Sequence, residues 1–352
     1  MNIFSKLFIR LFSFILPVFM LGYHVAAHEL SAEDMKIEAG LDPFLLGKLR
    51  QNGASRTPAP MRKPIDFSSP KSKTKVVMLG SGSPIPLIER FGPGVAVVVN
   101  DRPYLIDSGE GIWRASQAAT PKYGGKIEGL DAKNLDRLFL THHHADHISN
   151  LPSIIYLPWY LGSDRQLDIY GPRNTAKIVN KILDAYQYVI DVGEVTGTKY
   201  DAPIIAKGHD FITSGRVYED ENVIVDAFKV LHGNMPNSFS YKFTTKDRVV
   251  VISGDKRATP GFKEWAKGAN LMLHEVYTLG GLENAPGRVP LIVGSYHTST
   301  EQLAEVANYV KPELLVLYHV QNYTGDPNGP MDELRSAGYE GEVVIAVDQD
   351  IY

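Results

Sequence analysis

Apolar residues along the chain gather in short runs that are separated by glycine- and proline-rich turns and by longer stretches with helical spacing. Short apolar runs between turn residues predict buried strands. On this pattern we expect strands at 75–79, 95–100, 104–107, 138–140, 166–170, 224–230, 249–252, 271–273 and 314–318. The helical spacing predicts helices at 175–188, 259–267 and 300–310. Strands that alternate with helices favour an α/β fold.

The chain divides into three predicted parts. Residues 1–27 read as a signal peptide, because Lys6 and Arg10 precede an apolar run and small residues stand before His28. The run is too short for a comfortable membrane span, although an uncleaved anchor is the alternative. Residues 28–73 are predicted to form an extension and linker with two short helices, at 31–39 and 42–50. The folded domain is expected at 74–352.

Composition and charge narrow the classes of partner. The 352 residues carry a formal charge of −4, and the removal of residues 1–27 would leave −6. Proteins that grip long polyanions normally show a basic surplus, so a dedicated nucleic-acid binder is disfavoured. The chain has no cysteine, so any metal must be held by nitrogen and oxygen.

The most informative segment is residues 141–147, Thr-His-His-His-Ala-Asp-His, which follows the apolar run at 138–140. In an extended backbone, side chains two apart share a face, so His142, His144 and Asp146 should project together. His147 would reach the same place as the chain turns out of the strand. These are too many ligands for one four-coordinate zinc with an open position. We therefore expect two adjacent metal ions.

Further candidates stand just beyond later apolar runs: His232, Asp255, His274, Glu275 and His319. Strand ends pool their residues at one edge of a sheet, so these side chains should meet the histidine segment. Each has a structural alternative, because a strand-end histidine is often merely buried and an aspartate often forms a turn.

The spacing His-x-His-x-Asp-His resembles the signature of the metallo-β-lactamase superfamily. The resemblance implies an αββα sandwich, in which two mixed β-sheets are flanked by helices. It assigns His142, His144 and His232 to a first metal, Asp146, His147 and His319 to a second, and Asp255 to a bridge between them. It also implies two zinc ions, although nitrogen and oxygen ligands would suit manganese or iron as well. His143 should point away from the metals.

Two further segments, 273–277 and 296–302, resemble paired segments of ribonuclease Z and its relatives. This implies that Glu275 and His297 assist the departure of the leaving group, as candidate proton donors. Asp146 is also expected to be catalytic, and His274 is expected to be a buried structural histidine. A metal pair lowers the pKa of bound water from 15.7 to about 7, so hydrolysis can run at neutral pH.

These observations predict a periplasmic or secreted dinuclear zinc hydrolase of phosphoric diesters or aryl sulfates, acting on a small anionic ester. The alternatives are a lactone or β-lactam hydrolase, a ribonuclease Z-type endoribonuclease and a non-catalytic binding protein. Three features argue against transfer-RNA maturation: the export signal, Lys256 where the family usually has threonine, and the absence of a glycine- and lysine-rich arm before His232. A homodimer held by residues 28–73 is a further open alternative.

Overall fold

The computed structural model describes residues 62–69, 72–195 and 205–352. Apart from 286–288, these residues belong to one compact unit. The predicted signal peptide and the two predicted helices of the extension lie outside the described residues. Among the residues that are described, no helix is both long and apolar enough to cross a membrane.

The first sheet contains six strands in the order of the chain, and it is mixed. Its first three strands pair antiparallel and the remaining neighbours pair parallel. The strands are β1 (Thr74–Gly80), β2 (Gly94–Val99), β3 (Arg102–Ile106), β4 (Arg137–Phe139), β5 (Leu167–Pro172) and β6 (Ala206–Phe211).

The second sheet contains seven strands, again with an antiparallel part followed by a parallel part. The two sheets therefore repeat one plan, although the sequence shows no internal repeat. The strands are β7 (Gly215–Glu219), β8 (Ile224–His232), β9 (Met235–Thr244), β10 (Val249–Ile252), β11 (Leu271–Tyr277), β12 (Leu314–Gln321) and β13 (Val343–Ile345).

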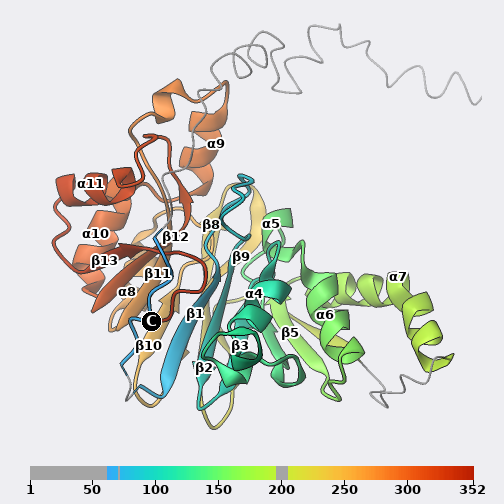
Figure 1. The fold of residues 1–352 in the computed structure, drawn as a ribbon. Helices are drawn as coiled ribbons and strands as arrows, with labels where there is room; N and C mark the ends of the chain where they lie inside the picture. The colour runs from blue at the N-terminus through green and yellow to red at the C-terminus, as the bar shows by residue number, and fades with distance from the viewer. Residues whose placement is uncertain (1–61, 70–71, 196–204) are drawn as a thin grey trace, which may run out of the picture. The chain divides into compact units, whose positions relative to one another are not determined.

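Helices cover the outer face of each sheet (Figure 1). On the first sheet lie α4 (Ile112–Ala118), α6 (Leu151–Tyr160) and α7 (Thr175–Val195), and on the second lie α8 (Pro260–Ala266), α10 (Thr300–Val310) and α11 (Gly329–Ser336). The shorter helices are α5 (Ala145–Ile148), α9 (Val289–Tyr296), η1 (Pro121–Tyr123), η2 (Glu128–Leu130), η3 (Ala132–Asn134) and η4 (Leu282–Asn284).

Three apolar layers hold this αββα sandwich together. The middle layer joins side chains of both sheets, such as Tyr104 and Phe139 from the first and Tyr241 and Val316 from the second. One outer layer lies between the first sheet and helices α4, α6 and α7, and the other between the second sheet and α8, α10 and α11. The predicted fold class is therefore confirmed.

The sequence prediction differs from the structure in three respects. Helix α7 continues to Val195 instead of ending near residue 188. The elements that were not predicted are strands β6, β7, β9 and β13, helices α4, α5, α6, α9 and α11, and the short 3-10 helices. The extended backbone expected through Asp146 ends earlier, because helix α5 begins at Ala145.

Two segments from opposite ends of the described chain are joined. Arg62 forms a bidentate ion pair with the buried carboxylate of Asp350, and the backbone of Phe67 donates to Ile351. Residues 62–69 and 72–73 are the described part of the predicted linker, and a stretch of them thus pairs with residues 350–351 near the C-terminus of the chain.

Candidate metal centre

The candidate ligands come together at one edge of the two sheets, from strand ends on both. The loop after β4 carries His142 and His144, and the first turn of α5 carries Asp146 and His147. The second sheet contributes His232 from the end of β8, Asp255 from the loop after β10 and His319 from β12. All seven predicted residues lie in two neighbouring groups, His142–His144–His232 and Asp146–His147–Asp255–His319.

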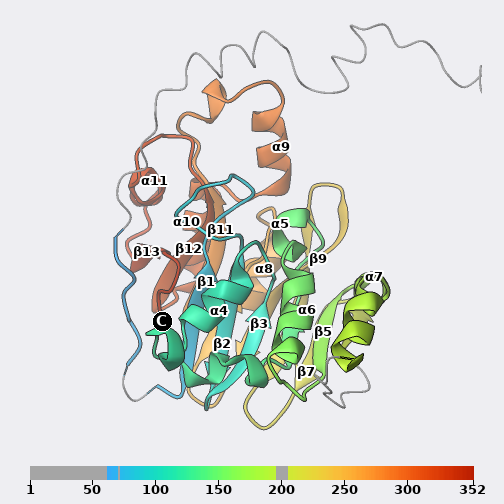
Figure 2. The ribbon, with the colours of Figure 1, turned by 45° about the vertical axis from the view of Figure 1, so that its right-hand side comes forward.

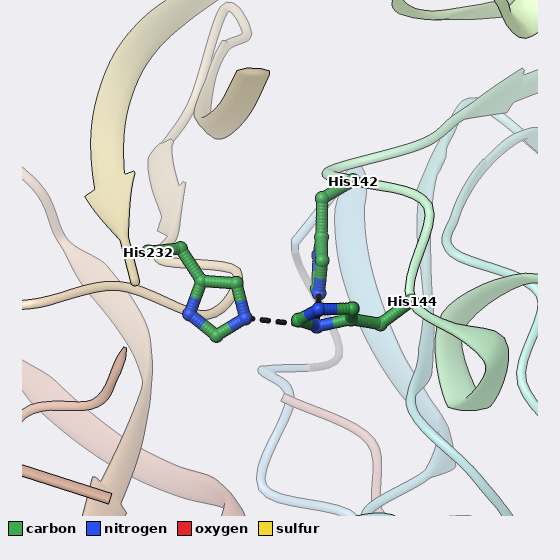
Figure 3. A group of neighbouring side chains, drawn as sticks. All are labelled: His142, His144 and His232. Atoms are coloured by element: carbon green, nitrogen blue, oxygen red, sulfur yellow. Dashed lines mark hydrogen bonds between the residues drawn. The ribbon is translucent and has the colours of Figure 1, made fainter. Parts of the chain in front are cut away.

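In the first group, three ring nitrogens point at one another (Figure 3). The Nδ1 of His144 lies 3.0 Å from the Nε2 of His142 and 3.0 Å from the Nε2 of His232. In His142 and His232, the other ring nitrogen, Nδ1, already has a hydrogen-bond partner outside the group. His232 Nδ1 donates to the carbonyl oxygen of Tyr296 at 2.8 Å, and this fixes its Nε2 as a lone pair.

The tautomer of His142 follows from a relay of hydrogen bonds. The hydroxyl of Thr141 donates to the carboxylate of Asp107 at 2.8 Å, so it can only accept from His142 Nδ1, 3.0 Å away. The Nε2 of His142 is therefore also a lone pair. A single proton on His144 can satisfy only one of the two lone pairs that face it. A cation at this point would satisfy all three nitrogens, so the residues fit a metal ion.

In the second group, the carboxylate of Asp255 occupies the central position. Its Oδ2 lies 3.4 Å from the Nε2 of His147 and 3.4 Å from that of His319, and 3.8 to 4.0 Å from His232 and His142 of the first group. Among the described residues, none donates a hydrogen bond to its buried Oδ1. A carboxylate between two sets of imidazoles, with one oxygen unpartnered, suits a bridge between two cations.

Asp146 and His319 complete the second group. The Nε2 of His319 lies 3.2 Å from Asp146 Oδ2, and the Nε2 of His147 lies 3.5 Å from the same oxygen. His147 is oriented from behind, because its Nδ1 donates to Asp107 at 2.8 Å. Asp107 thus supports two histidines without joining either group.

The backbone is strained at two points of this site. Asp107 and His319 adopt left-handed backbone conformations, with φ of 59° and 49°. Such conformations cost energy in residues other than glycine, and they often mark functional sites. In the turn before Asp255, Gly254 also has a positive φ, of 55°, and a Cβ there would lie 2.9 Å from Thr141. The Ser-Gly-Asp turn therefore requires glycine.

Burial sets the charge of the histidines. It lowers the pKa of His142 well below its usual range and that of His232 to about 4, so both are neutral, as metal ligands must be. Burial acts on His147 in the same direction, but Asp255 and Asp107 outweigh it and raise the pKa of this residue.

The two predicted proton donors lie beside the bridge. The Nδ1 of His297 lies 3.2 Å from Glu275 Oε2 and 3.9 Å from Asp255 Oδ2. Glu275 is fully buried, and its other oxygen accepts from the backbone of Thr298 at 2.9 Å. Burial lowers the pKa of His297, but Glu275 and Asp255 raise it overall. The pair therefore favours a protonated imidazole next to the candidate metal centre.

Three neighbouring residues take no direct part in the two groups. His143 instead bonds to Thr175 through its Nε2 at 2.9 Å. His274 is buried against Phe262, and burial lowers its pKa to about 3. The ammonium of Lys256 lies 4.0 Å from the centre of the Phe262 ring, and burial lowers its pKa to about 7.

Two further residues support the site and were not predicted from the sequence. Tyr296 orients His232 through its carbonyl, and its ring lies 5.1 Å from that imidazole. Its position directly before His297 was the available signal. Asp348 accepts hydrogen bonds from the backbone and hydroxyl of Ser81, whose carbonyl accepts from His319. These partners are 267 residues apart in the chain, and no local pattern indicates such a contact.

Comparison with known families identifies the class of protein. Residues 102–320 match the family described as the β-lactamase superfamily domain. The chain therefore belongs to the metallo-β-lactamase superfamily, and it is a metal-dependent hydrolase of that superfamily.

Closer relatives define the branch. A ribonuclease Z from Mycobacterium sp. (strain KMS) is 30% identical over 247 residues, which cover 70% of this chain and 83% of the relative. A ribonuclease Z from Mycobacterium marinum is 26% identical over 248 residues, covering 70% of this chain and 85% of the relative. Within the superfamily, the chain belongs to the ribonuclease Z branch.

Solved structures agree on the fold. The metallo-β-lactamase fold protein YhfI from Bacillus subtilis aligns with a TM-score of 0.60 at 18% identity, over 80% of this chain and 99% of YhfI. The short form of human tRNase Z aligns with a TM-score of 0.54 at 22% identity, over 79% of this chain and 98% of the human chain.

Proposed function

We propose that the protein is an exported dinuclear zinc hydrolase that cleaves phosphoric diesters or aryl sulfates. The observation that carries the proposal is the Glu275–His297 pair beside Asp255. A hydrolase of reactive amides or lactones has little need for a strong acid, whereas an ester with a poor leaving group needs a proton at the departing oxygen.

The residues have distinct roles in this proposal. His142, His144 and His232 would hold one ion, Asp146, His147 and His319 the other, and Asp255 both. When bound, the ions supply a nucleophile at neutral pH and offset negative charge on the attacked group. His297 holds a proton for the leaving oxygen, and Glu275 orients its ring through Nδ1, so that Nε2 is the nitrogen that can donate.

Export rests on residues 1–27, whose basic start, apolar run and small residues are typical of a signal peptide. We expect a periplasmic or secreted protein. N-terminal sequencing of the mature chain should find a start at His28, and a cytoplasmic chain that begins at Met1 would contradict export.

The decisive test is a panel of chromogenic phosphodiesters, aryl sulfates, lactones and β-lactams, offered to the zinc-loaded protein. We expect turnover of the phosphodiesters or sulfates. Preferred turnover of lactones or β-lactams would reject the proposal.

A ribonuclease Z-type endoribonuclease is the second candidate, because the relatives described above carry that name. The overall negative charge argues against it, since RNA binding draws on basic side chains. Efficient cleavage of a transfer-RNA precursor by the same preparation would favour this candidate.

A further inference from the structure

Exposed aliphatic side chains stand on two segments that border the candidate metal centre. The loop after β1 carries Ile85, Leu87 and Ile88, of which Ile88 is 97% exposed. Helix α9 carries Leu291, 74% exposed, and Ile292. We call these five residues the apolar rim. Large apolar side chains that gather on a surface near a site often mark a binding surface.

The loop is joined directly to the metal centre. The carbonyl of Ser81, at the base of the loop, accepts from the backbone of His319 at 2.9 Å. The loop closes on itself where Gly82 donates to Phe91 at 2.8 Å. Asp348 links the two ends of the loop, because its carboxylate accepts one hydrogen bond from the backbone N–H of Ser81 and another from that of Phe91. The loop is therefore anchored beside a candidate ligand.

Helix α9 is joined to the other side of the centre. Its last residue, Tyr296, contacts His232 through its carbonyl and its ring. Ile292 lies one turn before Tyr296, so the two share a face of the helix. In Figures 1 and 2 the loop, α9 and α5 all lie at the same edge of the sheets.

The charges of these segments decide what the apolar rim can receive. Helix α9 has no charged residue, and the loop adds only Glu89 and Arg90. The guanidinium of Arg90 is turned inward, where it donates to Ser81 Oγ at 2.9 Å and to the carbonyl of Ala346 at 2.8 Å. A long phosphate backbone would find little positive charge here, whereas an apolar group could cover the aliphatic side chains.

We propose that the apolar rim binds the leaving group of the substrate, and that this substrate is a small anionic ester of an apolar alcohol or phenol. This inference rests on the function proposed above. In the reaction, water gives up one proton, its oxygen bonds to phosphorus or sulfur, and the bond to the ester oxygen breaks. His297 gives its proton to the ester oxygen, and the neutral alcohol leaves over the rim. The proton released from water restores that of His297 for the next cycle.

The test uses methyl 4-alkylphenyl phosphates and 4-alkylphenyl sulfates with alkyl chains from methyl to hexyl. The acidity of the phenol hardly changes along each series, so only apolar contact varies. With the full-length, zinc-loaded protein we expect kcat/KM to rise about two- to fourfold for each added methylene, the upper figure corresponding to full burial.

Two rim variants and one matched control locate the effect. Ile88→Ser and Leu291→Ser should flatten the dependence of kcat/KM on chain length, without a change of melting temperature, because both side chains are exposed. Val189→Ser removes an aliphatic side chain that is 44% exposed on α7, on the far side of the first sheet from α9, and should leave the dependence unchanged.

Hydrolysis at a rate independent of chain length would overturn the inference and leave the proposed function intact. A chain-length dependence that both rim variants retain would also overturn it. Faster cleavage of a transfer-RNA precursor than of every ester would overturn it too, in favour of RNA as substrate. If none of the phosphates or sulfates is hydrolysed, the proposed function itself fails, and the inference with it.

Discussion

The hydrogen bonds behind the imidazoles determine which ring nitrogen faces the metal centre. Asp107 orients two of these imidazoles. It accepts a hydrogen bond directly from His147, and it accepts one from the hydroxyl of Thr141, which in turn accepts from His142. It accepts at both oxygens, including 2.8 Å bonds from the backbone of Thr141 and from the hydroxyl of the same residue. Only a carboxylate can accept all of these protons.

Asp107→Asn should therefore weaken metal binding while leaving all seven candidate ligands in place. The amide NH₂ would oppose an N–H or O–H donor and disturb the tautomer of a histidine. Loss of such a supporting carboxylate typically costs about 10- to 100-fold in metal affinity. Competition with a chromophoric chelator measures this loss. Asp226→Asn, on β8, is the control and should bind metal as the parent does. If the parent, Asp107→Asn and Asp226→Asn all bind metal with equal affinity, the role of Asp107 is contradicted.

His297→Ala should retain both metals and lose at least about tenfold in turnover on poor leaving groups. On good leaving groups the loss should be small, because little proton transfer is needed. Metal content must be measured alongside, since the Nδ1 of His297 is close enough to Asp255 to act as a ligand instead. His143→Ala, a histidine bonded to Thr175, is the matched control. Equal losses on good and poor leaving groups would reject the donor role.

At the scale of elements, apolar runs located most of the buried strands, but they missed the largely buried β9, in which aromatic residues alternate with serine and lysine. Strand β10 was predicted at 249–252 and α10 at 300–310, and both have these bounds. The missed strands β6 and β7 are polar and partly exposed, so backbone pairing with their neighbours defines them more than burial does. Side-chain patterns carry little information about such pairing.

The turn between β9 and β10 shows how one side chain links elements of both sheets. Asp247 in this turn accepts from the hydroxyl of Thr74, at the start of β1, at 2.5 Å and from the backbone of Lys73 at 2.9 Å. Burial alone would raise the pKa of Asp247, but these hydrogen bonds outweigh it and lower the pKa to about 2.

Asp247→Asn should reduce the free energy of unfolding near pH 7 by up to about 1 kcal/mol, a modest value because solvent screens an exposed carboxylate. Because the pKa is lower in the folded state, this stabilisation is complete above the unfolded pKa of about 3.9 and is lost as the pH falls towards 2. Urea unfolding of both proteins between pH 7 and pH 2 measures the difference. If the free energies of unfolding of the two proteins differ by the same amount from pH 7 to pH 2, the lowered pKa of Asp247 is contradicted.

At the scale of the whole molecule, the candidate metal centre connects the two sheets. His142, His144, Asp146 and His147 follow the first sheet, whereas His232, Asp255 and His319 belong to the second. Bound ions would therefore stabilise the packing of one sheet on the other, since binding to the folded state alone adds to its stability.

Removal of metal with a chelator should lower the melting temperature by roughly 5–15 °C, the effect of about 4 kcal/mol of binding free energy. Asp255→Ala should melt near the chelator-treated parent and respond little to the chelator itself. Calorimetry with parallel metal analysis tests both expectations. A parent protein that melts at the same temperature with and without chelator would contradict a stabilising metal centre.

Most of the site could be anticipated because its residues follow apolar strands in a recognisable order. The segment 141–147 and position 255 follow strands, position 232 ends β8, and position 319 lies in β12 two residues before its end. What could not be anticipated depends on contacts between distant parts of the chain. Arg62 with Asp350 and Ser81 with Asp348 are pairs of this kind, and the exposure of Ile88 and Leu291 appears only once the neighbouring segments are placed.

The order of the ligands along the chain also bears on how the protein matures. Asp146 and His319 are 173 residues apart, and the second of them lies on a strand that pairs with β11 and β13. The loop that they close is long, so the complete set of donors forms only after the second sheet has assembled. If the chain crosses a membrane unfolded, it would arrive empty and take up its cations at its destination, where activity would depend on the zinc supply outside the cytoplasm.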